Sequence, residues 1–230
     1  MATIDSQQQL AYQQIKRSLL AGEFPPGQRL SRRKLAATTG VSAPSVQHVL
    51  GQLANEGLVE VRPQSGTYPR ILSTAEFGEL AVLRRLLEPH AAAEAASRAS
   101  AKQHAVLKSC VRDMLTTADK IRRSANPVDE YLDDWYQLER LFHTTIWRAA
   151  GNSLIAATLE NLHILALAAM KAHELAEVFC QSTQGTALEH QQIQQAIAAH
   201  DAAAASAAMA HHLRPNPWDA GNEPATGHSL

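Results

Sequence analysis

The chain has 230 residues, a mass of 25.0 kDa and a formal net charge of −1 at pH 7. Hydrophobic residues make up 45% of it but aromatic residues only 5%, and alanine runs such as 91–93 and 202–205 account for much of the difference. Because alanine favours helices and β-branched residues are few, this composition argues against an all-β fold. Two cysteines, Cys110 and Cys180, are too few for a disulfide framework or a four-cysteine zinc ribbon, and they suit a reducing cytosol.

The sequence also argues against a membrane or secreted protein. Its longest nearly unbroken apolar stretch, residues 162–170, is far shorter than the ~20 residues that span a bilayer. Residues 1–10 lack the basic-then-apolar pattern of a signal peptide. We therefore expect a cytoplasmic, mainly α-helical protein with no membrane partner.

The small net charge conceals an asymmetry between the two ends of the chain. Residues 1–74 carry a formal charge of +4, whereas residues 75–230 carry −5 and hold ten of the eleven histidines. A basic segment joined to a longer acidic, histidine-rich segment predicts different partners for the two parts, with nucleic acid favoured for the first.

Helical spacing of apolar residues and turn signals divide the basic segment into short elements. Ser31 and Ser42 are suitable N-caps for two successive helices, the second of which ends at Gly57. Two β-like pieces joined by residues 63–66 predict a hairpin. The expected elements are helices over 11–20, 32–39 and 43–56 and strands over 58–62 and 67–71. This order predicts a winged helix-turn-helix domain over residues 1–72.

From Ser73, which forms a capping-box pattern with Glu76, helical periodicity continues almost to Arg214. The expected helices, with breaks near Ser100, Asn126, Gly151 and Gly185, cover residues 74–98, 101–124, 128–149, 153–180, 186–199 and 201–213. We therefore expect a second domain over 73–213, an antiparallel all-helical bundle, followed by a loosely ordered tail over 214–230.

The second and third helices of the first domain are expected to bind DNA. A helix N-terminus in the major groove gives short side chains access to base edges, while flanking cations contact phosphates. The basic triplet 32–34 suits a phosphate clamp, although a solvated helix face is the alternative, and Gln47 has the donor and acceptor that suit adenine. The predicted DNA-binding residues are Arg32, Arg33, Lys34, Ser42, Ser45, Gln47, His48, Arg62 and Gly66.

These residues lie within a stretch that resembles the GntR family of transcriptional regulators. The resemblance is carried by Ile15, residues 22–30, Leu35, Ala36, residues 40–42, Val46, Leu50, Leu53, residues 56–59 and Gly66. It implies binding to a double-stranded DNA operator. Arg32 stands where the family usually has glutamate, and Ala43 and Gln47 replace arginines that ordinarily contact DNA. The usual family operator is therefore not expected.

The acidic segment contains a candidate metal site. Glu139 and His143 are four residues apart and therefore share a helix face. Together with His190 and His212 they would offer one carboxylate and three imidazoles, a set that suits Zn²⁺, Ni²⁺ or Mn²⁺. Because this segment holds ten histidines, such pairs also arise by chance, and the spacing alone leaves both interpretations open.

The same segment resembles the FCD domain, the helical effector-binding partner of the FadR-type GntR subfamily. The resemblance rests on the motifs Arg84-x-x-Leu87-Glu88 and Glu139-x-x-Phe142-His143, on residues 150–152, and on closing motifs over 190–197 and 201–213. It implies that Glu139, His143, His190 and His212 hold a divalent metal, with Zn²⁺ favoured and Glu139 in place of the family's aspartate. It also implies that the effector is a small organic or sugar acid.

Arg84 is one candidate for effector binding. Its helix is expected to pack three leucines inward, Leu80, Leu83 and Leu87. Arg84 would then face the bundle, where it would meet a carboxylate ligand or, as we favour, pair with Glu88.

Asn152 is the other candidate, and it suits either a pocket contact or an N-cap, which we favour. We expect His211 to be solvated, and His163 and His173 to be ordinary, partly buried residues rather than ligands.

Together these observations predict a ligand-responsive transcriptional regulator, a repressor that binds a two-fold operator as a homodimer. One recognition helix buries too little surface for the ~10⁻⁸–10⁻¹¹ M affinity of specific regulators, so two heads are expected to act together. A metal-free regulator whose histidines bond an anion is the main alternative. A metalloenzyme is disfavoured because the sequence has neither a Gly-x-Ser-x-Gly motif nor two Glu-x-x-His pairs.

Overall fold

The computed structural model describes residues 2–20, 23–25, 27–172 and 176–214. The chain divides into two compact units, the first formed by residues 1–72 with 164–173 and the second by residues 73–163 with 174–230. Within the described ranges, no helix is long and apolar enough to cross a membrane. The tail expected over 214–230 lies outside the described residues, apart from Arg214.

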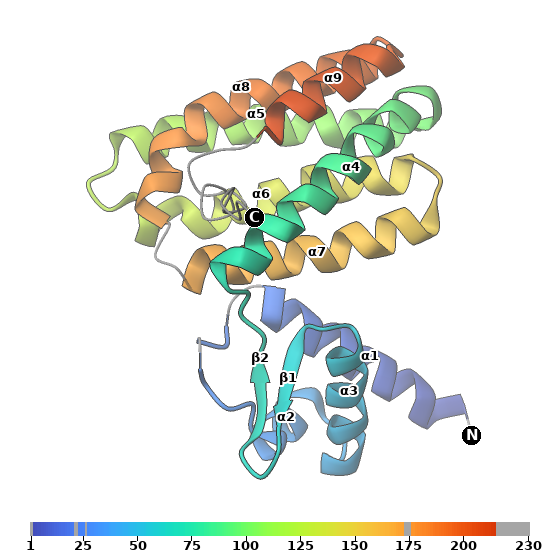
Figure 1. The fold of residues 1–230 in the computed structure, drawn as a ribbon, viewed down its shortest axis with the longest axis vertical. Helices are drawn as coiled ribbons and strands as arrows, with labels where there is room; N and C mark the ends of the chain where they lie inside the picture. The colour runs from blue at the N-terminus through green and yellow to red at the C-terminus, as the bar shows by residue number, and fades with distance from the viewer. Residues whose placement is uncertain (1, 21–22, 26, 173–175, 215–230) are drawn as a thin grey trace, which may run out of the picture. The chain divides into compact units, whose positions relative to one another are not determined.

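The first unit has the predicted order of three helices and a hairpin (Figure 1). Its elements are α1 (Ala2–Leu20), α2 (Arg32–Thr39), α3 (Ala43–Asn55), β1 (Val59–Arg62) and β2 (Gly66–Pro69). α3 lies at the centre of this unit, in contact with α1, α2 and β1. It buries Val46, Val49, Leu50 and Leu53. α1 begins at Ala2, nine residues before Ala11, the first apolar position that marked this helix in the sequence.

Capping residues set the turn between α2 and α3. The Oγ of Ser31 accepts a hydrogen bond from the backbone N–H of Lys34, and Gly40 ends α2 in the left-handed conformation with a φ of 71°. The Oγ of Ser42 accepts from the backbone N–H of Ser45 and so caps α3. These local signals explain why both helices have nearly the predicted bounds.

β1 and β2 form an antiparallel hairpin, the wing, in which Arg62 is paired with Gly66 and Val59 with Pro69. Pairing begins at Gly66, whose φ of 127° is open to glycine but strained for other residues. The strand predicted over 67–71 therefore starts one residue early, and its last two residues lie beyond β2.

The second unit is a helical bundle, as predicted (Figure 1). Its helices are α4 (Thr74–Arg98), α5 (Ala101–Arg123), α6 (Pro127–Ala149), α8 (Ala176–Ala198) and α9 (Ala202–His212). It also contains the first part of α7 (Ser153–Ala172), whose residues from 164 onward belong to the first unit. α5 packs against α6 and α8, while α4 packs against α6, α8 and α9. Ser73 and Ser100 start α4 and α5 with capping boxes. The largest fully buried side chains of this unit include Trp135, Phe142 and Trp147, all on α6.

The predicted break at Gly185 is wrong, because α8 runs through this residue. A glycine inside a helix costs only about 1 kcal/mol relative to alanine. α8 offsets this cost by burying one face against α5 and α9, and that face includes Ala187, Ile193 and Ile197. The helix predicted over 153–180 stops instead at Ala172, and residues 173–175 lie outside the described residues.

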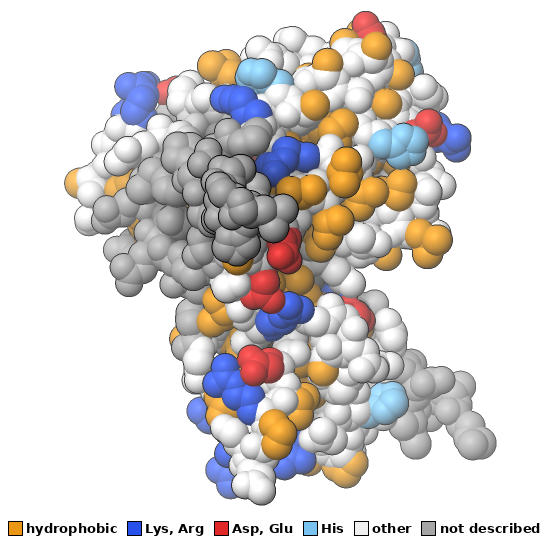
Figure 2. Space-filling view, in the orientation of Figure 1, with side chains coloured by type: hydrophobic (Ala, Val, Ile, Leu, Met, Phe, Trp, Pro, Cys, Tyr) orange, Lys and Arg blue, Asp and Glu red, His pale blue; other side chains and the backbone are white. Residues whose placement is uncertain are grey.

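One residue of the face of α4 that we expected to point inward lies outside instead. Leu80 is buried, but Leu83 is 46% exposed. The buried face of α4 consists mainly of small side chains, namely Ala91, Ala92, Ala95 and Ala96. Nearer the start of α4, Val82, Leu83 and Leu86 are 47%, 46% and 68% exposed. Figure 2 shows apolar side chains gathered along the course of α4.

Candidate functional site

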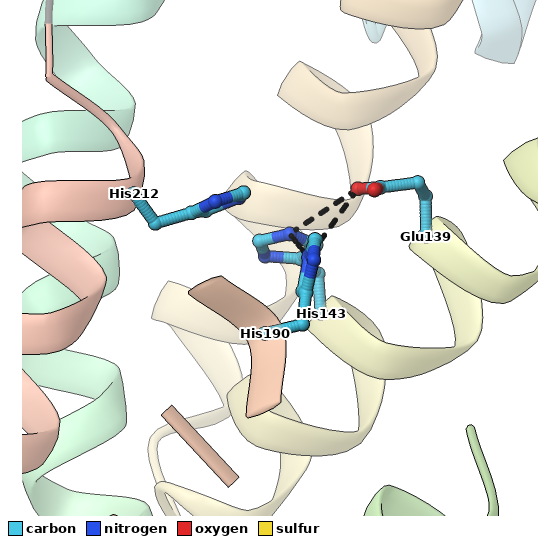
Figure 3. A group of neighbouring side chains, drawn as sticks. All are labelled: Glu139, His143, His190 and His212. Atoms are coloured by element: carbon cyan, nitrogen blue, oxygen red, sulfur yellow. Dashed lines mark hydrogen bonds and ion pairs between the residues drawn. The ribbon is translucent and has the colours of Figure 1, made fainter. Parts of the chain in front are cut away.

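Four side chains from three helices meet inside the bundle (Figure 3). Glu139 and His143 project from α6, His190 from α8 and His212 from the end of α9. Their ligand atoms, one from each residue, all lie within 4.8 Å of one another. The structure thus brings together the four predicted metal ligands, which we call the Glu139 cluster.

The spacing of these atoms fits a small divalent ion. The Nε2 atoms of His143 and His190 are 3.2 Å apart, and each lies 3.6 Å from Oε2 of Glu139. Ligands bound ~2.1 Å from a tetrahedral ion lie ~3.4 Å from one another. The three atoms therefore already have the separations of neighbouring metal ligands.

Hydrogen bonds at the outer ring nitrogens direct the inner nitrogens toward the cluster. Nδ1 of His143 donates to Oε2 of Glu88 over 2.7 Å, and Nδ1 of His212 donates to Oε2 of Glu189 over 3.0 Å. Nδ1 of His190 donates to the backbone carbonyl of Thr186 over 2.8 Å. A histidine that donates from Nδ1 can present the Nε2 lone pair to a metal, and such outer partners are typical of metal sites.

These tautomers place two Nε2 atoms face to face, so a cation is needed between them. Burial by itself lowers the pKa of His143, but the carboxylates of Glu88 and Glu139 raise this pKa to about 9. Burial lowers the pKa of His190 to about 3. The facing nitrogens are therefore stable with either one proton or one metal ion between the two rings.

Glu139 is buried with one oxygen unsatisfied. Burial would raise its pKa, but His190 and His143 hold the pKa of this carboxyl well below its ordinary value. Its Oε1 atom has no hydrogen-bond partner among the described residues. Because buried polar atoms in proteins are nearly always paired, this oxygen is a second reason to expect a ligand or ion here.

Glu88 connects the cluster to α4. It is fully buried and accepts hydrogen bonds from Nε of Arg84 and from Nε1 of Trp147, as well as from His143. Burial would raise the pKa of Glu88, but Arg84 and His143 hold it well below its ordinary value. The Arg84–Glu88 pair that we favoured from the sequence is therefore present, and it braces His143.

Glu189 has the same function for His212, and sequence analysis missed it. Nη1 of Arg214 donates to Oε1 of Glu189, which leaves Oε2 for His212. Burial would raise the pKa of Glu189, but its bonds to His212 and Arg214 lower it. No motif marks this residue, because its partners lie at the end of α9 and just after it, and only the packing of α8 against α9 brings them together. His211 is 59% exposed, as predicted.

His163 differs from the prediction that it is an ordinary, partly buried residue. It is only 4% exposed, and neither ring nitrogen has a hydrogen-bond partner among the described residues. Its ring centroid lies 5.9 Å from that of His143 and 5.6 Å from that of Trp147. Burial lowers the pKa of His163 to about 3. His173 lies outside the described residues.

Asn152 caps α7, as favoured from the sequence. Its Oδ1 accepts hydrogen bonds from the backbone N–H groups of Leu154 and Ile155, each over 3.1 Å. It also lines a surface pocket of about 350 Å³ beside Glu94 and Arg98. No member of the Glu139 cluster lines this pocket.

The predicted DNA-binding side chains occupy α2, α3 and the wing. Seven of them are exposed, namely Arg32, Arg33, Lys34, Ser42, Gln47, His48 and Arg62. Nη1 of Arg32 donates to Oε1 of Gln47 over 2.9 Å and so joins α2 to α3. α3 has no lysine or arginine of its own, and this bond gives it a cation from α2.

The remaining predicted DNA contacts have structural functions as well. The hydroxyls of Ser42 and Ser45 lie 2.9 Å apart where α3 begins, and Ser42 is the cap. Gly66 has a φ of 127°, which favours glycine, and an added Cβ would also displace the side chain of Arg29, whose Nε would lie 2.5 Å away. The guanidinium of Arg62 lies 4.5 Å from the ring centroid of Tyr68 and bonds Glu60.

Comparison with relatives matches both units to known families. The model of the bacterial regulatory proteins of the gntR family matches residues 7–68, and the FCD domain model matches residues 79–215. The HTH-type transcriptional repressor RspR of Escherichia coli is 27% identical over 154 residues, which cover 67% of this chain and 64% of RspR. The chain thus aligns with less than two thirds of that relative. The HTH-type transcriptional regulator Mce2R of Mycobacterium tuberculosis is 30% identical over 193 residues, 74% of this chain and 80% of Mce2R.

Solved structures show the same fold. McbR/YncC of E. coli superposes with a TM-score of 0.75 at 19% identity, covering 90% of this chain and 93% of that one. A putative transcriptional regulator GntR from Rhodococcus sp. RHA1 superposes with a TM-score of 0.69 at 21% identity, and the match covers 90% of this chain and 94% of that one. Since the FCD model alone matches more than half of the residues, the chain belongs to the GntR family of bacterial regulatory proteins and carries an FCD domain.

Proposed function

We propose that this chain is a transcriptional repressor that binds a double-stranded DNA operator in the cytoplasm and changes its affinity when a small organic acid binds to its helical unit. The observation that carries this proposal is the joint presence of an exposed basic α2–α3 surface and a buried, pre-oriented Glu139 cluster. Two findings support it. The relative RspR is named a transcriptional repressor, and this chain belongs to a family of regulators rather than enzymes.

The Glu139 cluster would hold one divalent ion, with Zn²⁺ favoured and Ni²⁺ or Mn²⁺ as alternatives. Three imidazole nitrogens and one carboxylate oxygen suit these ions, and the bound ion would supply a Lewis acid for the oxygen atoms of an acid. Glu88, Glu189 and the carbonyl of Thr186 keep the three Nε2 atoms directed inward. Glu139 supplies the negative charge among the four ligands.

Binding of an ion and an acid at the Glu139 cluster would change how the helices of the bundle pack. The ligands of the cluster lie on α6, α8 and α9, so an ion and an acid bound there stabilise one arrangement of these helices. An effector changes DNA affinity only if it prefers one arrangement of the protein over another, and this bridging of helices supplies such a preference.

The regulator acts as a homodimer in this proposal, and α4 supplies the contact. Its exposed side chains Val82, Leu83 and Leu86 form an apolar strip on the second unit. A second copy is the occupant that DNA binding requires, because one recognition helix offers too little surface for specific binding.

The test uses full-length, untagged protein. Elemental analysis is expected to find about one Zn²⁺, Ni²⁺ or Mn²⁺ per chain, and His143→Ala is expected to lose it together with thermal stability, because a metal held between helices stabilises the fold. Glu139→Asp should keep the metal, since the carboxylate remains, whereas Glu139→Gln should bind it more weakly. His143→Ala should retain basal operator binding but lose the response to acids.

The metal-free interpretation gives a different result. A protein that stays free of metal in excess Zn²⁺ and still responds fully to an organic acid would contradict the metal site, and its histidines would then bond the anion directly. Loss of operator binding in His143→Ala would contradict the separation of the two functions.

A further inference from the structure

His163 is a buried polar residue without a partner, placed beside the Glu139 cluster. It lies on α7, is only 4% exposed, and finds no hydrogen bond for either ring nitrogen among the described residues. Leaving such groups unpaired costs free energy, so native proteins keep them where a ligand or water will pair them. Its ring stands 5.9 Å from His143, centroid to centroid.

The charges around this position favour a monoanion. Arg84 is paired with Glu88, and Arg214 with Glu189, so each of these pairs is neutral. A divalent ion in the cluster would face only the single negative charge of Glu139, which leaves one positive charge. A small monocarboxylate neutralises this charge and offers oxygen atoms both to the ion and to a neighbouring N–H group.

We propose that His163 donates a hydrogen bond to the carboxylate of the effector and is thereby a specificity-determining residue for small monocarboxylic acids. The inference rests on the proposed function, since it needs the metal-loaded cluster. An imidazole carries at least one N–H in every protonation state, so this donor is always present. The ring of Trp147 also packs against His163, with the two ring centroids 5.6 Å apart.

The experiment uses full-length, untagged protein loaded with Co²⁺, whose visible spectrum reports exchange of ligands at the ion. Acetate is the probe, and acetamide, which has the same shape without the charge, is the control ligand. His163→Phe keeps a ring but removes the donor. It should lower the affinity for acetate about tenfold or more, as expected for a bond to a charged group, while Co²⁺ affinity stays unchanged. Acetamide should bind weakly to both proteins.

A stability measurement separates this function from a merely structural one. Because His163 has no partner to lose, His163→Phe without acetate should melt at or above the temperature of the wild type. His163→Gln retains a donor and should bind acetate better than His163→Phe. His104→Phe is the matched control: His104 Nε2 is likewise buried without a partner among the described residues, but its ring neighbours His200. This control should bind acetate as the wild type does.

Three results would overturn the inference. They are wild-type acetate affinity in His163→Phe, loss of Co²⁺ in that variant, and a Co²⁺-loaded wild type that acetate does not perturb. A wild-type protein that binds no Co²⁺ would instead contradict the metal site itself, so the two failures are distinguishable.

Discussion

The carboxylate of Glu88 accepts a hydrogen bond from Nδ1 of His143 over 2.7 Å, across 55 positions of sequence. Both side chains are fully buried, and the same carboxylate also accepts from Arg84 and Trp147. Glu88 on α4 therefore holds Nδ1 of His143, and this leaves Nε2 of the α6 histidine facing the Glu139 cluster.

Glu88→Gln should weaken Zn²⁺ binding about tenfold to a hundredfold, the usual effect of losing an outer partner of a metal-binding histidine. The amide keeps the shape of the side chain but removes the charge that holds His143 and Arg84. Chelator competition measures the affinity. The matched control is Glu94→Gln on the same helix, whose bond to Arg98 is largely exposed. Equal Zn²⁺ affinity in Glu88→Gln and wild type would show that Glu88 has no part in the site.

Metal affinity should fall as pH falls. Because the pKa of His143 is raised to about 9, this histidine holds its extra proton below that pH, and the proton must leave when the metal binds. Apparent Zn²⁺ affinity should therefore drop about tenfold per pH unit between pH 8.5 and 6.5, with about one proton released per ion. Calorimetry in buffers of different ionisation enthalpy counts the proton. An affinity that does not change over this range would contradict the proton between the two rings.

Arg32 and Gln47 should act on DNA as a coupled pair. Arg32→Ala should weaken binding to all DNA sequences and reduce the slope of log affinity against log salt concentration by about one. Lys34→Ala should have the same effect, although Lys34 makes no bond to Gln47 on α3. Gln47→Ala should mainly relax base preference. Because Arg32 donates to Gln47, the double variant should lose less than the sum of the two single variants. Fluorescence anisotropy against selected duplexes measures this, and strict additivity would show that the bond does not persist on DNA.

Leu86→Glu should dissociate the dimer. Leu86 is 68% exposed in the single chain, and a carboxylate buried in its place would weaken association about tenfold or more. Sedimentation should then find the 25.0 kDa monomer. Val61→Glu, at a 55% exposed apolar residue of the wing, is the control and should leave the assembly unchanged. A dimer that survives Leu86→Glu at wild-type strength would place the interface elsewhere.

Local sequence was enough for much of the fold because its signals act over a few residues. The caps Ser31, Ser42 and Ser73 and the glycine at 40 place helix ends through hydrogen bonds and backbone conformation within one turn. Likewise, the four-residue spacing of Glu139 and His143 puts both on one face of α6 whatever surrounds it. A glycine is a weaker signal, and at Gly185 the packing of α8 overrode it.

Only the tertiary structure decided the surroundings of the candidate site. The resemblance to FCD domains pointed to His190 and His212, but it contained nothing on the partners of their Nδ1 atoms or on Glu189. The burial of His163 and the exposure of Leu83 were both predicted wrongly. Burial and hydrogen-bond partners depend on which helix faces meet across the bundle, and those contacts join residues far apart in sequence, where no local periodicity records them.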